Sequence, residues 1–200
     1  MVLHFKDAEQ MDSYRLSILI PSLETRKHLL DETLRCFHLQ IMNGNHYDVE
    51  ILTDIDNRET TTGEKRNRLI ERARGKYIVF FDDDDSAMDN YISSILTAIE
   101  KDPDVIPING YMTTNGSNPV HWDMGLGFGY GTKILNGVMV YDRFPNHIAA
   151  MKRELILPYK FKDITIGEDY EWAKRLNDDN VFKTEIRITE AIYHYKYIEK

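Results

Sequence analysis

The sequence predicts an α/β fold in which a central, mostly parallel β-sheet is flanked by helices. Three observations support this prediction. Short apolar runs alternate with longer amphipathic or charged segments through the first half of the chain, which gives the order β-α-β-α-β-α-β. One apolar run, opened by Gly75, leads directly into four consecutive aspartates. The second half lacks this alternation and ends in two further apolar runs, and we expect a small antiparallel part there.

The composition predicts one globular domain with an ordinary core. The chain has 200 residues, of which 42% are hydrophobic and 29% are charged. Its formal net charge of −8 argues against a nucleic-acid-binding protein that works by bulk electrostatics. Cys36 is the only cysteine, which excludes an intramolecular disulfide and favours a reducing, cytoplasmic location. We expect a polar lead-in without a signal peptide at residues 1–14. No apolar run approaches the roughly 18 residues of a membrane span, so we expect no integral membrane segment.

Hydrophobic spacing predicts the elements of the first half. Within residues 24–42, apolar residues recur at intervals of three and four, which places Leu30 and Phe37 on one face of a helix. Residues 60–74 are rich in arginine and predict a helix with an exposed basic side that Gly75 closes. We expect right-handed crossovers between the parallel strands. The expected order is strand 16–20, which Pro21 stops, helix 24–42, strand 47–53, helix 60–74, strand 76–81, helix 88–99 and strand 105–108.

The second half of the chain has a less regular pattern. Residues 115–131 contain five glycines among polar and aromatic residues, which predicts a long functional or mobile loop. Gly167 introduces a segment with acids in its first turn, as is typical of a helix start. The expected elements are strand 132–141, a short helix within 146–157, a loop that turns into a helix over 167–176, and strands 181–188 and 191–197.

The aspartates Asp82–Asp85 are the first candidate for chemistry. They follow a buried strand, and open α/β sheets bind ligands at the carboxyl ends of their strands. Adjacent negative charges repel one another, and hard carboxylate oxygens suit Mg²⁺, Mn²⁺ or Ca²⁺. An EF-hand fits poorly, since Ala87 occupies the position of its turn glycine and Ser93 the position of its last glutamate. The cluster therefore predicts a metal site, with a solvated acidic loop as the alternative.

Glu168 and Asp169 form a second acidic cluster at an expected helix start. A carboxylate at such a junction of loop and helix is well placed to act as a general base. The alternative is a charge that stabilises the helix dipole, which is common.

Several single residues are candidates for binding, each with a plainer alternative. Asp54, at the end of the second strand, could accept hydrogen bonds from a base or ribose, or form a turn. Lys65 and Arg66 could meet a diphosphate, or lie on a solvated helix face. His194 could complete a hard-metal site, or be structural. Trp122 could stack on a sugar or a base, or pack in the core.

In their order along the chain, these residues resemble the inverting glycosyltransferases of family 2, which have the GT-A fold, a Rossmann-like sandwich. The resemblance extends over residues 16–197. It rests on a Pro-Ser turn after the first strand, an aspartate after the second, an Arg-Asn pair, a Gly-x-Tyr-Ile-x-Phe-x-Asp-x-Asp-Asp motif and a late Glu-Asp pair. The matching residues are Pro21–Ser22, Asp54, Arg66–Asn67, Gly75–Asp85 and Glu168–Asp169.

The resemblance implies a role for each of these residues. The nucleotide sugar would be bound by Pro21, Ser22, Asp54, Lys65, Arg66, Asp82 and Asp83. A Mn²⁺ or Mg²⁺ ion would be held by Asp84, Asp82 and His194. Asp169, with Glu168 beside it, would be the catalytic base, and Trp122 would lie on the acceptor side.

The implied function is metal-dependent, inverting transfer of a sugar from a nucleoside diphosphate sugar, expected to be UDP-linked, to an acceptor hydroxyl. The acceptor stays open among a glycan, a lipid carrier, a protein and a modified nucleic-acid base. One domain, residues 1–200, would contain a nucleotide-binding half at 15–110 and an acceptor and catalytic half at 111–200. The alternatives are a non-catalytic module that binds a nucleotide sugar or glycan, and a sugar nucleotidyltransferase. The second is weaker, because no glycine-rich loop follows the first strand.

Overall fold

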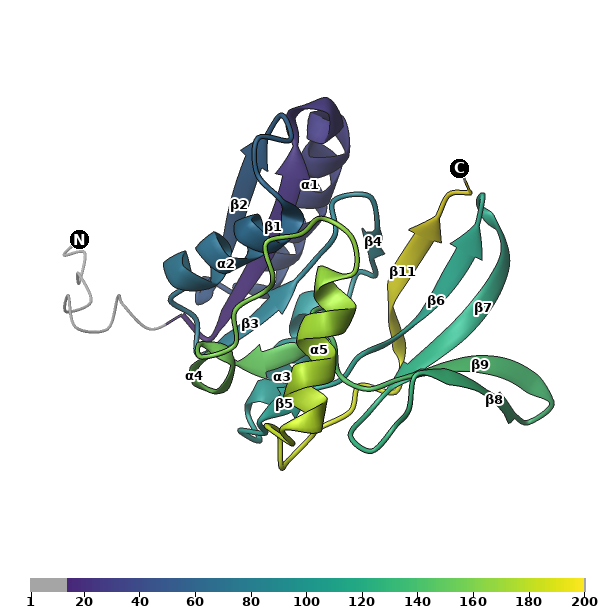
Figure 1. Ribbon diagram of the computed structural model, residues 1–200. Coiled ribbons are helices and arrows are strands. Elements are labelled where there is room, and N and C mark those ends of the chain that lie inside the picture. Colours follow the sequence, from purple (N-terminus) through teal and green to yellow (C-terminus); the bar gives the residue numbers. More distant parts are fainter. Residues whose placement is uncertain (1–13, 200) are drawn as a thin grey trace.

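The computed structural model describes residues 14–199, which form two β-sheets and five α-helices (Figure 1). Residues 1–13, most of the expected polar lead-in, lie outside this part. The helices are α1 (Lys27–Gly44), α2 (Thr62–Arg72), α3 (Tyr91–Ile99), α4 (Arg153–Ile156) and α5 (Glu168–Asp178), and a 3-10 turn, η2 (Glu24–Arg26), precedes α1. The strands are β1 (Leu16–Leu23), β2 (Val49–Asp56), β3 (Tyr77–Phe80), β4 (Ser86–Ala87), β5 (Val105–Ile106), β6 (Asn109–Thr114), β7 (Ser117–Met124), β8 (Gly131–Leu135), β9 (Val138–Arg143), β10 (Ala150–Lys152) and β11 (Ala191–Tyr197).

The first sheet has five strands in the order β2-β1-β3-β10-β5. β1 pairs in parallel with β2 and β3, whereas β10 runs antiparallel between β3 and β5. The chain moves from β1 to β2 in one direction and returns past β1 to β3, so right-handed crossovers place α1 and α2 on opposite faces. α1 packs with α3, and α2 packs with α5. The predicted mostly parallel sheet flanked by helices is confirmed.

The second sheet is larger than the small antiparallel part that the sequence predicts. It has six strands in the order β4-β11-β6-β7-β9-β8 and is mixed, since β11 with β6 and β7 with β9 pair in parallel. The prediction of a loop at residues 115–131 is wrong for residues 117–124, because these form β7, which pairs with β6 in a hairpin. Asn115 and Gly116 connect these strands with φ values of +51° and +76°, the left-handed geometry that Asn-Gly favours in tight hairpins.

Three further segments differ from the sequence-based expectation. The strand expected at 132–141 is a hairpin of β8 and β9, with a second left-handed Asn-Gly turn at Asn136–Gly137. The helix expected within 146–157 shrinks to α4, because β10 enters the first sheet before it. Residues 181–188 form only an isolated bridge between Glu185 and Val105. The expected helix at 167–176 and the strand at 191–197 are confirmed.

β1 continues through Pro21, where the sequence predicts a stop, and ends at Leu23. Residues 16–19 of β1 pair with strands on both sides, whereas Pro21 and the residues after it pair with β2 alone. A proline lacks the N–H group that a strand paired on both sides needs, and it is tolerated where pairing is one-sided. The end of β1 therefore lies free on its β3 side, beside the acidic cluster.

Buried aromatic rings hold the second sheet against the end of β3. Phe81 packs on Tyr193 of β11 with ring centroids 4.9 Å apart, and on Phe37 of α1 at 4.9 Å. Tyr91 of α3 completes the cluster, 5.5 Å from Phe81. All four side chains are almost completely buried. This packing sets the position of β11 relative to the aspartates that follow Phe81. Residues 14–199 contain no helix with the length and hydropathy that a membrane span needs.

Gly75 allows a close approach of the backbone instead of closing a helix. α2 ends at Arg72 with Ala73 as an extended cap, so the expected helix-closing role of Gly75 is wrong. A Cβ atom on Gly75 would lie 2.6 Å from both the backbone nitrogen and Oγ of Ser17 in β1. The N–H of Gly75 donates a hydrogen bond to that buried hydroxyl over 2.8 Å.

Gly75→Ala should lower the free energy of unfolding by about 1–3 kcal/mol, because β1 or the start of β3 must shift to admit the methyl group. Urea unfolding measures the change. Gly129→Ala is the matched control, since a Cβ atom there meets nothing within 4 Å. Equal effects of the two substitutions would contradict the prediction.

Candidate active site

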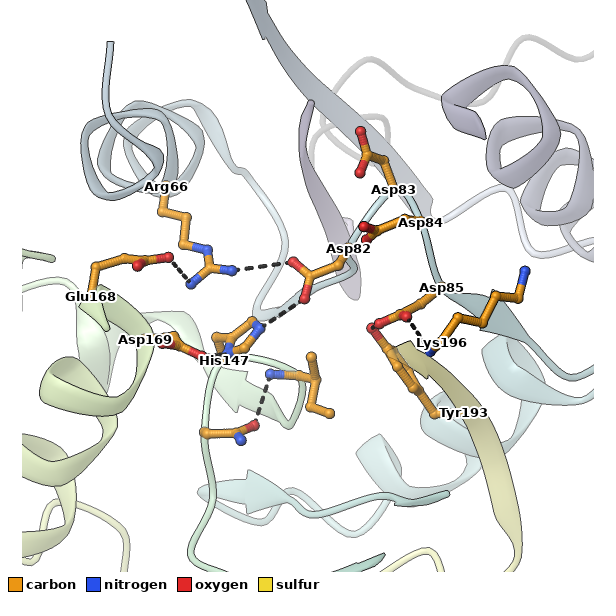
Figure 2. Close-up of polar contacts among 12 residues, drawn as sticks. Arg66, Asp82, Asp83, Asp84, Asp85, His147, Glu168, Asp169, Tyr193 and Lys196 are labelled. Carbon is orange, nitrogen blue, oxygen red and sulfur yellow. Dashed lines mark hydrogen bonds and ion pairs between the residues drawn. The ribbon is translucent and has the colours of Figure 1, made fainter. Parts of the chain in front are cut away.

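The carboxyl ends of β1, β2 and β3 meet at one edge of the first sheet, and Asp82–Asp85 lie there between β3 and β4 (Figure 2). The four carboxylates have four different surroundings. The four aspartates therefore differ in their hydrogen-bond partners and in their burial.

Asp82 connects the acidic cluster to the rest of the site. Arg66 Nη2 donates a hydrogen bond to Asp82 Oδ1 over 3.2 Å, and Nε2 of His147 lies 3.3 Å from Asp82 Oδ2 (Figure 2). Burial opposes ionisation, but the charges and hydrogen bonds of His147 and Arg66 lower the pKa of Asp82 overall. Asp82 is therefore an anion at neutral pH.

Asp83 and Asp84 share the cation Arg26 but differ in exposure. Asp83 is buried and accepts hydrogen bonds from Ser22 Oγ (2.5 Å) and Arg26 Nη1 (2.8 Å). Asp84 is 40% exposed at its side chain and lies 3.1 Å from the same Arg26 nitrogen. Partial burial raises the pKa of Asp84, Arg26 opposes this, and the charges of Asp82 and Asp83 raise the pKa further. Asp84 is thus the carboxylate with the most room for a ligand.

Asp85 joins the acidic cluster to β11. Its Oδ2 accepts a hydrogen bond from the Tyr193 hydroxyl (2.6 Å), and its Oδ1 accepts one from the backbone N–H of Lys196 (2.8 Å). Burial and the negative charge of Asp82 raise the pKa of Asp85 to about 8, although these two hydrogen bonds oppose the shift. This shift disfavours a further negative charge in the cluster.

Asp85→Asn should stabilise the protein at pH 8 and flatten the pH dependence of its unfolding. The pKa of this carboxyl is about 8 in the folded protein and about 3.9 in an unfolded chain. Since the unfolded state loses the proton first, wild-type stability should fall between about pH 4 and pH 8, by up to ~1.4 kcal/mol per pH unit. Urea unfolding of both proteins in EDTA measures the difference. Parallel pH profiles would contradict the assignment.

Glu168 begins α5 and faces Arg66. Gly167, with a left-handed φ of +81°, turns the chain into the helix. Arg66 Nη1 donates a hydrogen bond to Glu168 Oε1 over 2.9 Å, and both side chains are buried. Burial raises the pKa of Glu168, while the charge of Arg66 opposes the shift. One guanidinium thus connects Glu168, at the start of α5, to Asp82.

His147 links the two acidic clusters, and sequence reasoning missed it. Its Nδ1 lies 3.6 Å from Asp169 Oδ2, while its Nε2 faces Asp82 (Figure 2). Its side chain is 7% exposed, so the surrounding structure fixes the orientation of both ring nitrogens. No motif surrounds His147, and it precedes β10, a strand that the sequence pattern does not predict. Nothing in the spacing therefore points to it.

A pocket of about 310 Å³ lies between these acids and the second sheet. Asp82, Asp85 and Asp169 contribute to its wall. Trp122 of β7 lines it too, but is 7% exposed and packs edge-on against Tyr193 at 5.9 Å. Trp122 is therefore part of the core and of the pocket wall at once. Asp169, with a side chain 36% exposed, is the carboxylate of the second acidic cluster that opens into the pocket.

The other residues expected to bind the donor already have protein partners. The expected exposed basic side of α2 is wrong for Lys65 and Arg66, which are each 3% exposed. Lys65 Nζ donates to the carbonyl of Ser22 at the end of β1 (2.6 Å) and forms an ion pair with Asp56. Arg68 holds Asp54 through two hydrogen bonds of 2.8 Å. Pro21 precedes Ser22 at the same strand end, so all these residues border one edge of the sheet.

His194 lies on the other face of β11. Its neighbour Tyr193 points to Asp85, and successive strand residues face opposite sides. His194 stacks on Tyr111 at 4.3 Å, and its Nε2 lies 2.8 Å from Thr113 Oγ1. Among residues 14–199, no three His, Cys, Asp or Glu side chains gather closely enough to hold a metal by themselves. The structure thus brings His147, and not His194, to the aspartates.

Comparison with known proteins identifies the family to which this chain belongs. The sequence profile of glycosyl transferase family 2 matches residues 53–156. The chain belongs to this family. The family 2 match includes Asp54, the acidic cluster and His147, and it ends before Glu168 and Asp169. No curated protein matches the sequence.

Solved structures that resemble this member of family 2 include S. aureus TarS. Its fragment 1–349 has a TM-score of 0.63 and 16% identity over 91% of this chain, and its complex with UDP-GlcNAc has 0.64 and 14% over 93%. The chain spans 60% of that fragment and 36% of a longer TarS structure. At this identity the likeness concerns the fold, and it confirms the expected GT-A fold.

Proposed function

We propose that this chain transfers a sugar from a UDP-linked nucleotide sugar to an acceptor hydroxyl, with inversion at the anomeric carbon. The observation that carries the proposal is the link between the two acidic clusters. Asp82, on the donor side, and Asp169, the candidate base, open into one pocket and are joined through His147. The TarS structures with UDP-GlcNAc and UDP, on the same fold, support a UDP-linked donor.

The donor would lie along the edge formed by the ends of β1, β2 and β3, where nucleotides bind in such sheets. Asp54 is the proposed contact for the base, and Pro21 and Ser22 border the ribose. Lys65 and Arg66 are buried cations that already hold the carbonyl of Ser22 and the carboxylate of Asp82. Their role is to present this edge to the donor in a fixed geometry.

The acidic cluster fits a Mn²⁺ or Mg²⁺ ion. Its donors are hard carboxylate oxygens, and Mg²⁺ is commonly bound by one or two carboxylates together with substrate phosphates, without a protein cage. Asp84, the exposed carboxylate with a raised pKa, and Asp82 would hold the ion, with Asp83 and Ser22 supporting them. When bound, such an ion supplies positive charge against the diphosphate leaving group.

Asp169 is the proposed general base. It would accept the proton of the acceptor hydroxyl as that oxygen bonds to the anomeric carbon and the bond from that carbon to the diphosphate breaks. The products are the glycosylated acceptor, the nucleoside diphosphate and a protonated Asp169, which returns its proton to water. A single displacement of this kind inverts the anomeric centre.

The proposal is tested with a panel of nucleotide sugars that includes UDP-GlcNAc, in the presence of Mn²⁺. Slow release of nucleoside diphosphate and calorimetric binding of UDP are expected. Asp84→Ala should abolish the Mn²⁺ dependence of both, whereas the matched control Asp31→Ala, on the exposed face of α1, should change neither. Absence of UDP binding would contradict the proposal. Tight binding of UDP without turnover on water or any acceptor would favour a non-catalytic binding module.

A further inference from the structure

Arg143, the last residue of β9, places a positive charge on the wall of the pocket that contains Asp169. Its Nη1 donates hydrogen bonds to the carbonyls of Asp142 (2.7 Å) and Gly131 (3.2 Å), which fix the guanidinium in place. The guanidinium also lies 4.2 Å from the ring centroid of Tyr130 and 5.1 Å from that of Tyr141. These contacts orient the group without neutralising it.

The nearest acids of the second sheet are already paired with other cations. Asp142 forms an ion pair with Lys133, and Asp123 forms ion pairs with Lys133 and Arg187. Within residues 14–199, Arg143 forms no ion pair with any carboxylate. A fixed, half-buried guanidinium that lines a pocket and lacks an anion is suited to bind a carboxylate or a phosphate.

Exposed aromatic rings stand between Arg143 and Asp169. Tyr130, under the guanidinium, packs against Tyr170 with ring centroids 5.0 Å apart, and Tyr170 directly follows Asp169 in α5. Phe144 packs against Tyr130 with ring centroids 5.1 Å apart. Tyr130 and Tyr170 are 44% and 43% exposed, so part of each aromatic ring is open to contact with the apolar face of a sugar ring. Tyr130, in the pocket wall, and Tyr170, beside Asp169, thus offer a stacking surface next to the candidate base.

The rest of the pocket wall contains acidic side chains, so binding of an anionic acceptor would require a cation. Asp82 and Asp169 are carboxylates, and the chain as a whole has a formal charge of −8. An anionic acceptor would be repelled from such a pocket unless a cation received its charge. Arg143 lies on β9 of the second sheet, whereas the acids come from the end of β3 and from α5.

We propose that Arg143 is the anion-binding residue of the acceptor site, and that the acceptor is a glycan or glycoconjugate with a carboxylate or phosphate near the hydroxyl that is glycosylated. The sugar ring packs on Tyr130 and Tyr170, the anionic group pairs with Arg143, and the hydroxyl faces Asp169. The proposal rests on the proposed function in one respect, because only a sugar transferase has an acceptor. The binding chemistry itself does not depend on catalysis.

Binding of three probes tests the proposal in EDTA by ligand-observed NMR titration. Methyl β-glucuronide and glucose 6-phosphate carry the two anionic groups, and methyl β-glucoside is the neutral counterpart. At least one anionic probe should bind about ten-fold or more tightly than the neutral one, as expected for a charge-assisted pair. The probe that binds better identifies a carboxylate or a phosphate as the group recognised.

Substitutions of Arg143 test whether this residue causes the preference for the anionic probe. Arg143→Gln should remove the preference for the anionic probe, and Arg143→Lys should restore part of it. Arg72→Gln is the matched control, because this exposed arginine of α2 donates a hydrogen bond to the carbonyl of Thr53, away from the pocket. Its probe preference should equal that of the wild type. Equal affinity of the wild type for charged and neutral probes would overturn the proposal.

UDP affinity in the presence of Mn²⁺, measured on the same variants, separates the acceptor side from the donor side. If Arg143→Gln weakens UDP binding as much as it weakens binding of the anionic probe, Arg143 serves the donor diphosphate and the acceptor assignment is overturned. Failure of the proposed function would appear differently, as absence of UDP binding and sugar transfer in the wild type. The comparison of charged and neutral probes would still stand.

Discussion

Asp169→Asn should reduce kcat for sugar transfer by about 10²–10⁴-fold, the usual contribution of a general base. The amide keeps the size of the side chain but cannot accept the hydroxyl proton. Asp169 is the member of its acidic cluster that lines the pocket, whereas Glu168 is buried against Arg66. UDP affinity should stay close to the wild-type value, because Asp169 contacts the donor side only through His147.

Initial rates with the best donor and acceptor pair, together with calorimetric UDP titrations, measure these two quantities. Glu171→Gln is a suitable control, since this acid lies in the same helical turn but pairs with Arg175 and Lys162. It should retain activity near the wild-type level. A kcat for Asp169→Asn that matches the control would mean that the base lies elsewhere.

Arg66→Ala should lower the free energy of unfolding by about 3–5 kcal/mol, the usual effect of removing one partner from a buried ion pair. Arg66 is almost fully buried, bonds both Glu168 and Asp82, and packs 5.5 Å from the ring centroids of Phe80 and Phe161. The substitution leaves Glu168 buried without a cation and opens a cavity.

The loss should be smaller at pH 5 than at pH 8. The pKa of Glu168 is already raised by burial, and removing Arg66 removes the charge that opposes this shift. An acid with a raised folded-state pKa favours the folded state at low pH and loses that contribution as the pH rises. The double variant Arg66→Leu, Glu168→Leu should recover part of the stability, because no buried charge is then left unpaired at that position.

Urea unfolding of the variants measures these effects, with Arg72→Ala as the exposed control on the same helix. Surface substitutions usually change stability by less than about 0.5 kcal/mol. A loss in Arg66→Ala no larger than in Arg72→Ala would show that the buried network contributes nothing to stability.

The sequence predicts the parts of this protein that depend on local pattern. The alternation of apolar runs predicts the parallel sheet, because burial on both faces requires nearly continuous apolar strands. The strand that ends at Phe80 leads into Asp82–Asp85 as expected, and the acid-rich turn after Gly167 starts α5. The order of these motifs also identifies family 2, which the profile match confirms.

Side-chain direction is where sequence-based prediction of the site falls short. Lys65 and Arg66 belong to a charged segment that looks solvent-exposed, yet α2 turns both into the interior, where carboxylates and a carbonyl receive them. His194 lies close in sequence to Tyr193, but strand alternation turns it away from Asp85. Burial and register depend on neighbours that are distant in the chain, so periodicity within one segment cannot reveal them.

The sequence by itself determined the class of sheet, the acidic end of β3, the helical start at Glu168 and the family. Only the tertiary structure decided that the four aspartates have separate partners, that Asp169 opens into the pocket, and that His147 and Arg143 reach it. The reason is physical. Local spacing encodes which residues are buried in one element, whereas the pairing of β10 with β3 and of β9 with β7 brings together side chains that no local pattern relates.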